Sequence, residues 1–149
     1  MRLSTKGRYA VMAMADLARR QAEPCRAVAL AEIAARQEIS LSYLEQLFAR
    51  LRRKGLVQSA RGPGGGYRLA RTAAETSIAD IVHAVDEPLR ATRCSVQGKG
   101  CMLKGERCLT HDLWADLGDR IEDYLASVSL ADVIGGRLRA AKTAGVVAA

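Results

Sequence analysis

The sequence predicts a mainly α fold with a small β-hairpin and one long helix toward the C-terminus. Hydrophobic residues make up 49% of the 149-residue chain but include one Trp, one Phe and four Tyr, so the core is expected to consist of Ala, Leu, Ile and Val, which is typical of packed helices. Two short apolar stripes at helical spacing are separated by a tight turn. A glycine-rich run then separates two segments with strand character.

The first helix is predicted over residues 4–21. Pro24, after Glu23, ends it, because proline cannot continue a helix. Its apolar residues recur at helical spacing: Tyr9, Met12, Ala13, Leu17 and Ala18.

Two shorter helices follow, at about residues 30–36 and 40–54. A turn over residues 37–39 joins them, Ser40 caps the second one, and Gly55 ends it. A helix-turn-helix motif has this form, although an ordinary αα-hairpin is commoner among proteins as a whole. In a helix-turn-helix the second helix lies in the major groove of DNA and reads base edges with its first residues. Here those residues are Ser42, Tyr43, Glu45 and Gln46.

A β-hairpin is predicted next, with strands at residues 56–59 and 67–69. The turn between them, residues 61–66, reads RGPGGG. A phosphate-binding loop of a nucleotide enzyme would need Lys-Ser/Thr and a helix after its glycines, and here Tyr67 and a strand follow. Helix-turn-helix followed by a hairpin is the winged-helix plan, in which Arg61 and Arg68 flank the wing and Arg61 can enter a minor groove.

Charge is distributed unevenly along the chain. Residues 1–71 hold 14 Lys/Arg against five Asp/Glu, a net charge of +9, whereas residues 72–149 hold nine against 11, a net charge of −2. The basic half favours binding to a polyanion, although a soluble basic surface would give the same balance. Neither a secretory signal nor a membrane span is expected, which predicts a cytoplasmic protein that does not bind membranes.

Three further segments complete the prediction. Ser77 with Asp80 and Ser129 with Asp132 begin two helices, toward residues 86 and 140. Between them, residues 109–127 form a long amphipathic helix that is expected to pair with its copy in a second subunit. The sequence thus divides into a DNA-binding region (residues 1–71), a region with ligand loop and dimerisation helices (residues 72–142) and a disordered tail (residues 143–149).

Cysteines and a histidine gather in the predicted loop before the long helix. Cys94, Cys101 and Cys108 are separated by six residues each, and His111 follows after two more. His111 falls on the first turn of the long helix, and its spacing of three from Cys108 is expected to put both on one helical face. These four residues are therefore the predicted ligands of a metal centre.

The spacing leaves the type of centre open. Structural zinc sites use three Cys and one His, but their ligands usually come in tighter pairs. Wide gaps suit a two-iron cluster, for which mixed Cys/His ligation is unusual. Unrelated reduced thiols are a weaker alternative, a disulfide is disfavoured in the cytosol, and three similar thiols do not indicate an enzyme with one activated nucleophile. Cys25 and His83 are interpreted as a bystander and a surface residue.

Six motifs in the right order resemble the IscR-type family of iron–sulfur cluster regulators, a similarity that covers about residues 1–133. They are residues 1–10 (MRLSTKGRYA), 40–48 (SLSYLEQLF), 61–67 (RGPGGGY), 85–87 (VDE), 92–94 (TRC) and 108–114 (CLTHDLW).

The resemblance implies a homodimeric transcription regulator, not an enzyme, that controls iron–sulfur assembly genes as repressor or activator. It implies one [2Fe–2S] cluster per subunit, held by Cys94, Cys101, Cys108 and His111, with iron–sulfur assembly proteins as cluster donors. It also implies that Ser42, Tyr43, Glu45, Gln46 and Arg61 bind double-stranded operator DNA. A sister branch senses nitric oxide with a [4Fe–4S] cluster, and an acidic residue in its first helix can be a ligand. Arg8 and Tyr9 occupy that region here, which ranks that branch second.

Overall fold

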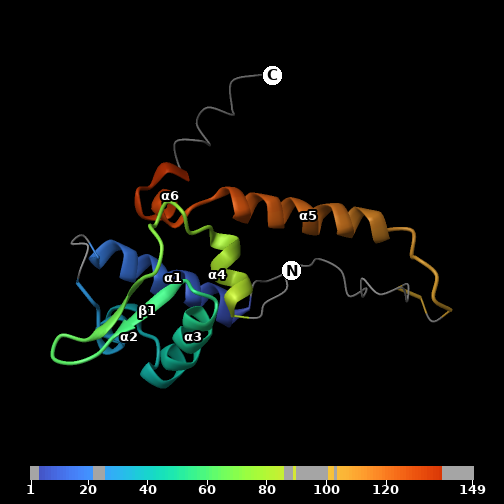
Figure 1. The fold of residues 1–149 in the computed structure, drawn as a ribbon. Coiled ribbons are helices and arrows are strands. Elements are labelled where there is room, and N and C mark those ends of the chain that lie inside the picture. The colour runs from blue at the N-terminus through green and yellow to red at the C-terminus, as the bar shows by residue number, and fades with distance from the viewer. Residues whose placement is uncertain (1–3, 22–25, 86–88, 90–100, 103, 139–149) are drawn as a thin grey trace.

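A computed structural model of the chain describes residues 4–21, 26–85, 89, 101–102 and 104–138. In that part of the chain, a two-stranded antiparallel hairpin lies at the edge of a group of packed helices, and one long helix extends away from them (Figure 1). The elements are α1 (Thr5–Arg20), α2 (Leu30–Gln37), α3 (Leu41–Arg53), β1 (Val57–Ala60), β2 (Gly66–Leu69), α4 (Ile78–Ala84), α5 (His111–Ser127) and α6 (Leu130–Ile134).

Helix α1 is the central element of the core. The side chain of Ser4 caps it by accepting the N–H of Lys6 at 3.2 Å. Its inner face packs against α2, α3, α4 and α6. The prediction of residues 4–21 is therefore confirmed, although Glu23 and Pro24, which were expected to end the helix, lie outside the described residues. Four side chains of this face are completely buried: Ala10, Ala13, Met14 and Leu17.

The predicted helix-turn-helix is formed by α2 and α3. Glu38 takes the left-handed conformation, with φ of 54°, which is strained for a residue with a side chain and sharpens the turn. Ser40 then accepts the N–H of Tyr43 at 3.3 Å, as an N-cap does. Helix α3 is fixed on the core by the buried side chains of Leu44, Leu47, Phe48 and Leu51.

An ion pair between a buried carboxylate and a partly exposed arginine fixes α2 against α1. Asp16, whose side chain is 6% exposed, accepts hydrogen bonds from Nε and Nη2 of Arg36 and from Nε2 of Gln37. The carboxylate raises the pKa of Arg36, chiefly through these hydrogen bonds. The sequence analysis did not predict this pair, since its partners lie 20 residues apart.

The hairpin forms as predicted, with Val57 opposite Leu69 and Ala60 opposite Gly66. Val28, just before α2, forms an isolated antiparallel bridge to Tyr67 through two backbone hydrogen bonds of 2.8 Å. Gly66 allows this approach, because a Cβ built there would lie 2.2 Å from the carbonyl oxygen of Val28. The base of the wing is thus joined to the start of the helix-turn-helix.

The two predicted capping boxes are both present, and they lie side by side. Ser77 and Ser129 form an antiparallel bridge in which Ile78 N–H donates to the carbonyl of Val128 at 2.9 Å and Leu130 N–H to that of Thr76 at 2.8 Å. Helix α4 ends at Ala84, slightly before the predicted end. The helix expected to run toward residue 140 is not continuous, because α6 ends at Ile134 and a turn at Gly135–Gly136 follows, with φ of +68° at Gly136. Residues 137–138 are helical again, and residues 139–140 lie outside the described residues.

The long helix begins at His111, two residues later than predicted, so Cys108 lies in the turn before it. The expectation that Cys108 and His111 share a helical face is therefore wrong, although the N–H of His111 donates to the carbonyl of Cys108 at 3.0 Å. Among the helices within residues 4–21, 26–85 and 104–138, none combines the length and apolar character that crossing a bilayer requires.

Candidate functional site

The predicted reading residues lie on the first turns of α3. Ser42, Glu45 and Gln46 are exposed, on the side opposite the buried Leu44 and Leu47. Their backbone is held by the Ser40 cap and by the core beneath them. The three side chains are therefore available to base edges in a groove, while their positions are set by a rigid helix.

Tyr43 differs from its neighbours because it is half-buried. Its ring packs edge-on against the ring of Tyr9 in α1, with centroids 5.9 Å apart and planes at 83°. An aromatic pair of this geometry stabilises the orientation of both rings. Tyr43 thus helps to pack α3 against α1 and is also partly exposed. Its place in the sequence did not indicate the packing role.

The wing lies on the same side of the molecule as α3, whereas α5 lies on the opposite side (Figure 1). Arg61 is exposed directly after β1, where Gly62 and Gly64 adopt positive φ values of 95° and 74° that favour glycine. Three more exposed cations, which the sequence analysis did not single out, end α3 and its cap: Arg52, Arg53 and Lys54. A basic helix beside a cationic wing is the geometry of a DNA-binding surface.

Two of the four predicted metal ligands are in direct contact. The Sγ of Cys101 lies 3.1 Å from Nδ1 of His111, at the exposed start of α5. Cys101 and Cys108 are not joined in a disulfide. Cys94 lies outside the described residues, and among the residues that are described no three potential ligands converge.

The chemistry of these donors fits an iron–sulfur cluster or a metal ion. Thiolate sulfur and imidazole nitrogen are ligands of both. Nδ1 of His111 is the nitrogen directed at Cys101, which leaves Nε2 available for a hydrogen bond that would fix the ring. Cys101 is exposed and His111 is the half-buried first residue of α5, and neither belongs to the hydrophobic core, so a cluster or ion can reach them without unfolding it.

Helix α5, which begins with His111, is connected to α4 by a polar contact between side chains. Nε2 of His83 in α4 lies 3.0 Å from Oε2 of Glu122 in α5. At the C-terminal end of α4, the guanidinium of Arg50 in α3 donates to the carbonyl of Val85 at 3.3 Å. Helix α4 therefore contacts both α5, which begins with the predicted ligand His111, and α3, which carries the predicted DNA-reading residues.

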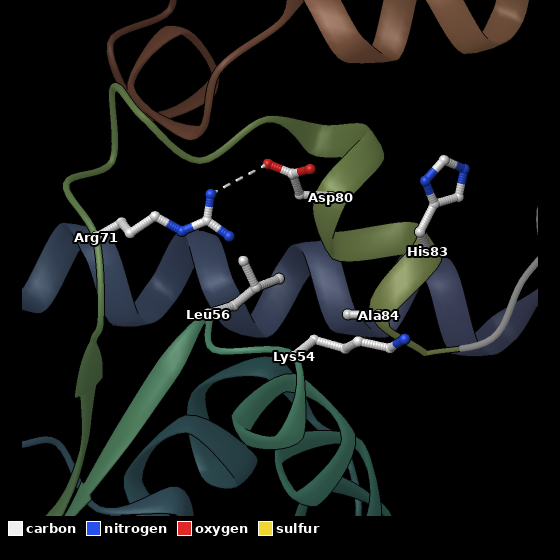
Figure 2. A pocket seen from close by; sticks show the side chains of 6 residues that line it. All are labelled: Lys54, Leu56, Arg71, Asp80, His83 and Ala84. Atoms are coloured by element: carbon white, nitrogen blue, oxygen red, sulfur yellow. Dashed lines mark ion pairs between the residues drawn. The ribbon is translucent and has the colours of Figure 1, made fainter.

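A hollow of about 190 Å³ lies beside α4, where Arg71 and Asp80 form an ion pair at 3.9 Å (Figure 2). The side chain of His83 is directed away from Lys54 and Arg71. None of the predicted DNA-binding or metal-ligating residues lines this hollow, which is formed by Lys54, Leu56, Arg71, Asp80, His83 and Ala84.

The family model of iron-dependent transcriptional regulators named Rrf2 matches residues 3–136, nearly the whole chain. The chain belongs to the Rrf2 family. A relative from Photorhabdus laumondii, named as the HTH-type transcriptional regulator IscR, is 55% identical over 137 residues, which are 92% of this chain and 81% of that protein. The Escherichia coli IscR proteins are 52% identical over 138 residues, with similar coverage.

Solved structures of Rrf2 regulators have the same fold. The structure of T. potens IscR has a TM-score of 0.71 at 36% identity and covers 100% of this chain and 94% of its own. That of CymR, the global cysteine regulator of B. subtilis, has a TM-score of 0.75 at 31% identity and covers 91% and 97%. The relatives are regulators and not enzymes, and this Rrf2 protein is a DNA-binding transcription regulator of the IscR type. The winged-helix prediction is confirmed.

Proposed function

We propose that the protein regulates iron–sulfur assembly genes by binding operator DNA as a homodimer, with a [2Fe–2S] cluster as its signal. The ligands would be Cys94, Cys101, Cys108 and His111, and iron–sulfur assembly proteins would donate the cluster. The proposal divides the chain into a DNA-binding region (residues 1–71), a sensing and dimerisation region (residues 72–142) and a tail. The observation that carries it is the contact between Cys101 and His111 in a chain of the IscR type.

The ligand residues would do two things. The thiolates and the imidazole hold the cluster, whose bound iron and sulfide supply sensitivity to oxidation and to the iron supply. His111, as the first residue of α5, also ties the occupancy of the site to the position of that helix. Because α5 contacts α4 through Glu122 and His83, and α4 contacts α3 through Arg50, a shift of α5 can change how the reading helix is held.

The homodimer is supported by the apolar stripe of α5. Leu113, Trp114 and Tyr124 are 60%, 42% and 57% exposed, although they recur at helical spacing on a helix of 17 residues. Large apolar side chains that remain exposed in a row mark an interface. A second copy is the occupant that fits, because two-fold dimers bind two operator half-sites with paired reading helices.

The first test is the visible absorption and EPR spectrum of protein purified without oxygen, together with iron, sulfide and zinc content. We expect a coloured protein with two iron and two sulfide per subunit, and loss of the colour in His111→Ala and Cys101→Ser. A colourless protein with bound zinc would show a zinc-stabilised, non-sensing regulator instead. Four iron per subunit would indicate the nitric-oxide-sensing type.

The second test concerns the DNA surface. A glutamate on a reading helix accepts from cytosine N4 and is repelled by phosphate, so Glu45 is expected to disfavour some operators until the cluster is bound. Glu45→Ala should therefore change the operator preference of the apo protein. Arg61→Ala should weaken binding to all operators and reduce the slope of log affinity against log salt concentration by about 1. Operator titrations at several salt concentrations measure both. An unchanged preference in Glu45→Ala would show that this residue does not discriminate.

A further inference from the structure

A chain of polar contacts leads from Trp114 to Cys108 through Thr110. The indole Nε1 of Trp114 lies 3.2 Å from Oγ1 of Thr110, and that oxygen lies 3.7 Å from Sγ of Cys108. We propose that Thr110 is a positioning residue for the cluster, whose hydroxyl donates a hydrogen bond to the Cys108 sulfur and is oriented by Trp114. This inference rests on the proposed function, since it concerns the sulfur as a cluster ligand.

The direction of both hydrogen bonds follows from the groups involved. An indole N–H only donates, so Oγ1 of Thr110 must be the acceptor of the bond from Trp114. The hydroxyl proton of Thr110 is then free to point elsewhere. A ligating thiolate has no proton, so between Thr110 and Cys108 only the threonine can donate.

The local structure indicates that Thr110 is not used as an ordinary helix cap. It occupies the N-cap position of α5, where a threonine side chain normally accepts a backbone N–H from the first turn, but here its side chain makes no such bond. The backbone N–H of Trp114 donates to the carbonyl of Thr110 at 3.2 Å, so Trp114 binds the residue through main chain and side chain. Four other N-caps of the described chain, Ser4, Ser40, Ser77 and Ser129, do accept a first-turn N–H.

A hydrogen bond to a ligating sulfur withdraws electron density from it. This favours the reduced cluster and raises its reduction potential, and such outer contacts also help to retain the metal. Thr110 would therefore influence two properties of the sensor: the potential at which the cluster changes state, and the ease with which it is lost.

The test is an anaerobic redox titration of the full-length, cluster-loaded protein, followed by the rate of cluster loss to a chelator. Thr110→Val keeps the side-chain shape without the hydroxyl, and Thr110→Ser keeps the hydroxyl. We expect Thr110→Val to shift the midpoint potential to a more negative value and to lose its cluster about 10-fold faster. Thr110→Ser should behave as the wild type. Trp114→Phe, which replaces the indole and its N–H donor by a smaller apolar ring, should shift the potential in the same direction by less.

Each result decides a different point. If Thr110→Val holds a cluster with the potential and loss rate of the wild type, Thr110 does not act on the Cys108 sulfur. If Thr110→Val does not fold, the test uses two other comparisons: the midpoint potential of Trp114→Phe against wild type, and that of Thr110→Ser against wild type. An unshifted potential in Trp114→Phe would then overturn the inference. If the wild type itself takes up no cluster, the proposed function fails and this inference fails with it.

Discussion

Helices α3 and α5 have similar apolar stripes but opposite surroundings. The stripe of α3 is buried in the core through Leu44, Leu47, Phe48 and Leu51, whereas Gly118 is the buried residue of α5. Sequence periodicity shows that a helix has an apolar face, but not whether the partner of that face belongs to the same chain. Within the described residues, α3 is packed into the core of its own chain, whereas α5 leaves Leu113, Trp114 and Tyr124 exposed.

The largest effect is expected when one leucine is shortened in each helix. Leu44→Ala should lower the free energy of unfolding by about 3 kcal/mol, because a completely buried side chain leaves a cavity. Leu113→Ala should leave the stability of the monomer unchanged and weaken self-association instead, because that side chain is 60% exposed. Chemical unfolding and sedimentation equilibrium separate the two outcomes. Equal losses of stability would mean that α5 is packed within its own chain.

A second contrast compares two ion pairs with the same 2.7 Å separation. Asp16–Arg36 in the core has a carboxylate that is 6% exposed, whereas Asp116–Arg120 on α5 has one that is 62% exposed. Asp16→Ala should lower the free energy of unfolding by about 2 kcal/mol, since it leaves Arg36 and Gln37 without the carboxylate that both of them bind. Asp116→Ala should unfold at the same denaturant concentration as the wild type. A measurable loss in Asp116→Ala would contradict the contrast.

A smaller effect is expected at the turn between α2 and α3. Glu38→Gly should stabilise the protein by about 0.5 kcal/mol, because glycine relieves the left-handed strain but adds freedom to the unfolded chain. Ala35→Gly is the matched control in the helical part of α2 and should destabilise by about 1 kcal/mol. Thermal unfolding of both variants checks the signs, and destabilisation in both would show that the turn is not strained.

The smallest effect concerns pH and α6, where the chain returns from α5 to the core. Hydrogen bonds from the Ser129 hydroxyl and from Arg137 lower the pKa of Asp132 from its usual 3.8 to about 2. A lowered folded-state pKa means that the charged form is favoured by folding, so its contribution is present above pH 4 and is lost as the pH falls through about 2. The melting temperatures of wild type and Asp132→Asn should therefore converge between pH 5 and pH 2. A constant difference would exclude this linkage.

Local signals in the sequence predicted most of the helices and the wing. Ser40, Ser77 and Ser129 each begin a helix as expected, since caps act within four residues. The glycines of residues 61–66 identified the hairpin in the same way. What the sequence did not show are contacts between distant residues, such as the Val28–Tyr67 bridge and the Asp16–Arg36 pair, for which no local pattern exists.

The candidate site shows the same limit. The spacing grouped Cys101 with His111, whose side chains are in contact in the structure, but it also placed Cys108 with His111 on one helical face. In the structure α5 begins only at His111, and it is Cys101, ten residues earlier, whose sulfur faces the imidazole. Periodicity does not fix the first residue of a helix to better than about two residues. The position of that first residue nevertheless decides which side chains face each other.

The bridge between Ser77 and Ser129 has a consequence for how such a regulator can change. The chain between these two serines contains α4, the predicted ligands and α5, and it begins and ends at neighbouring points, so its two ends are held together. Lengthening a loop whose ends stay together is inexpensive, about 0.6 kcal/mol for each doubling of its length. We therefore expect that insertions or deletions between the cysteines would alter the proposed ligand site at little cost to the folding of the helix-turn-helix and the wing.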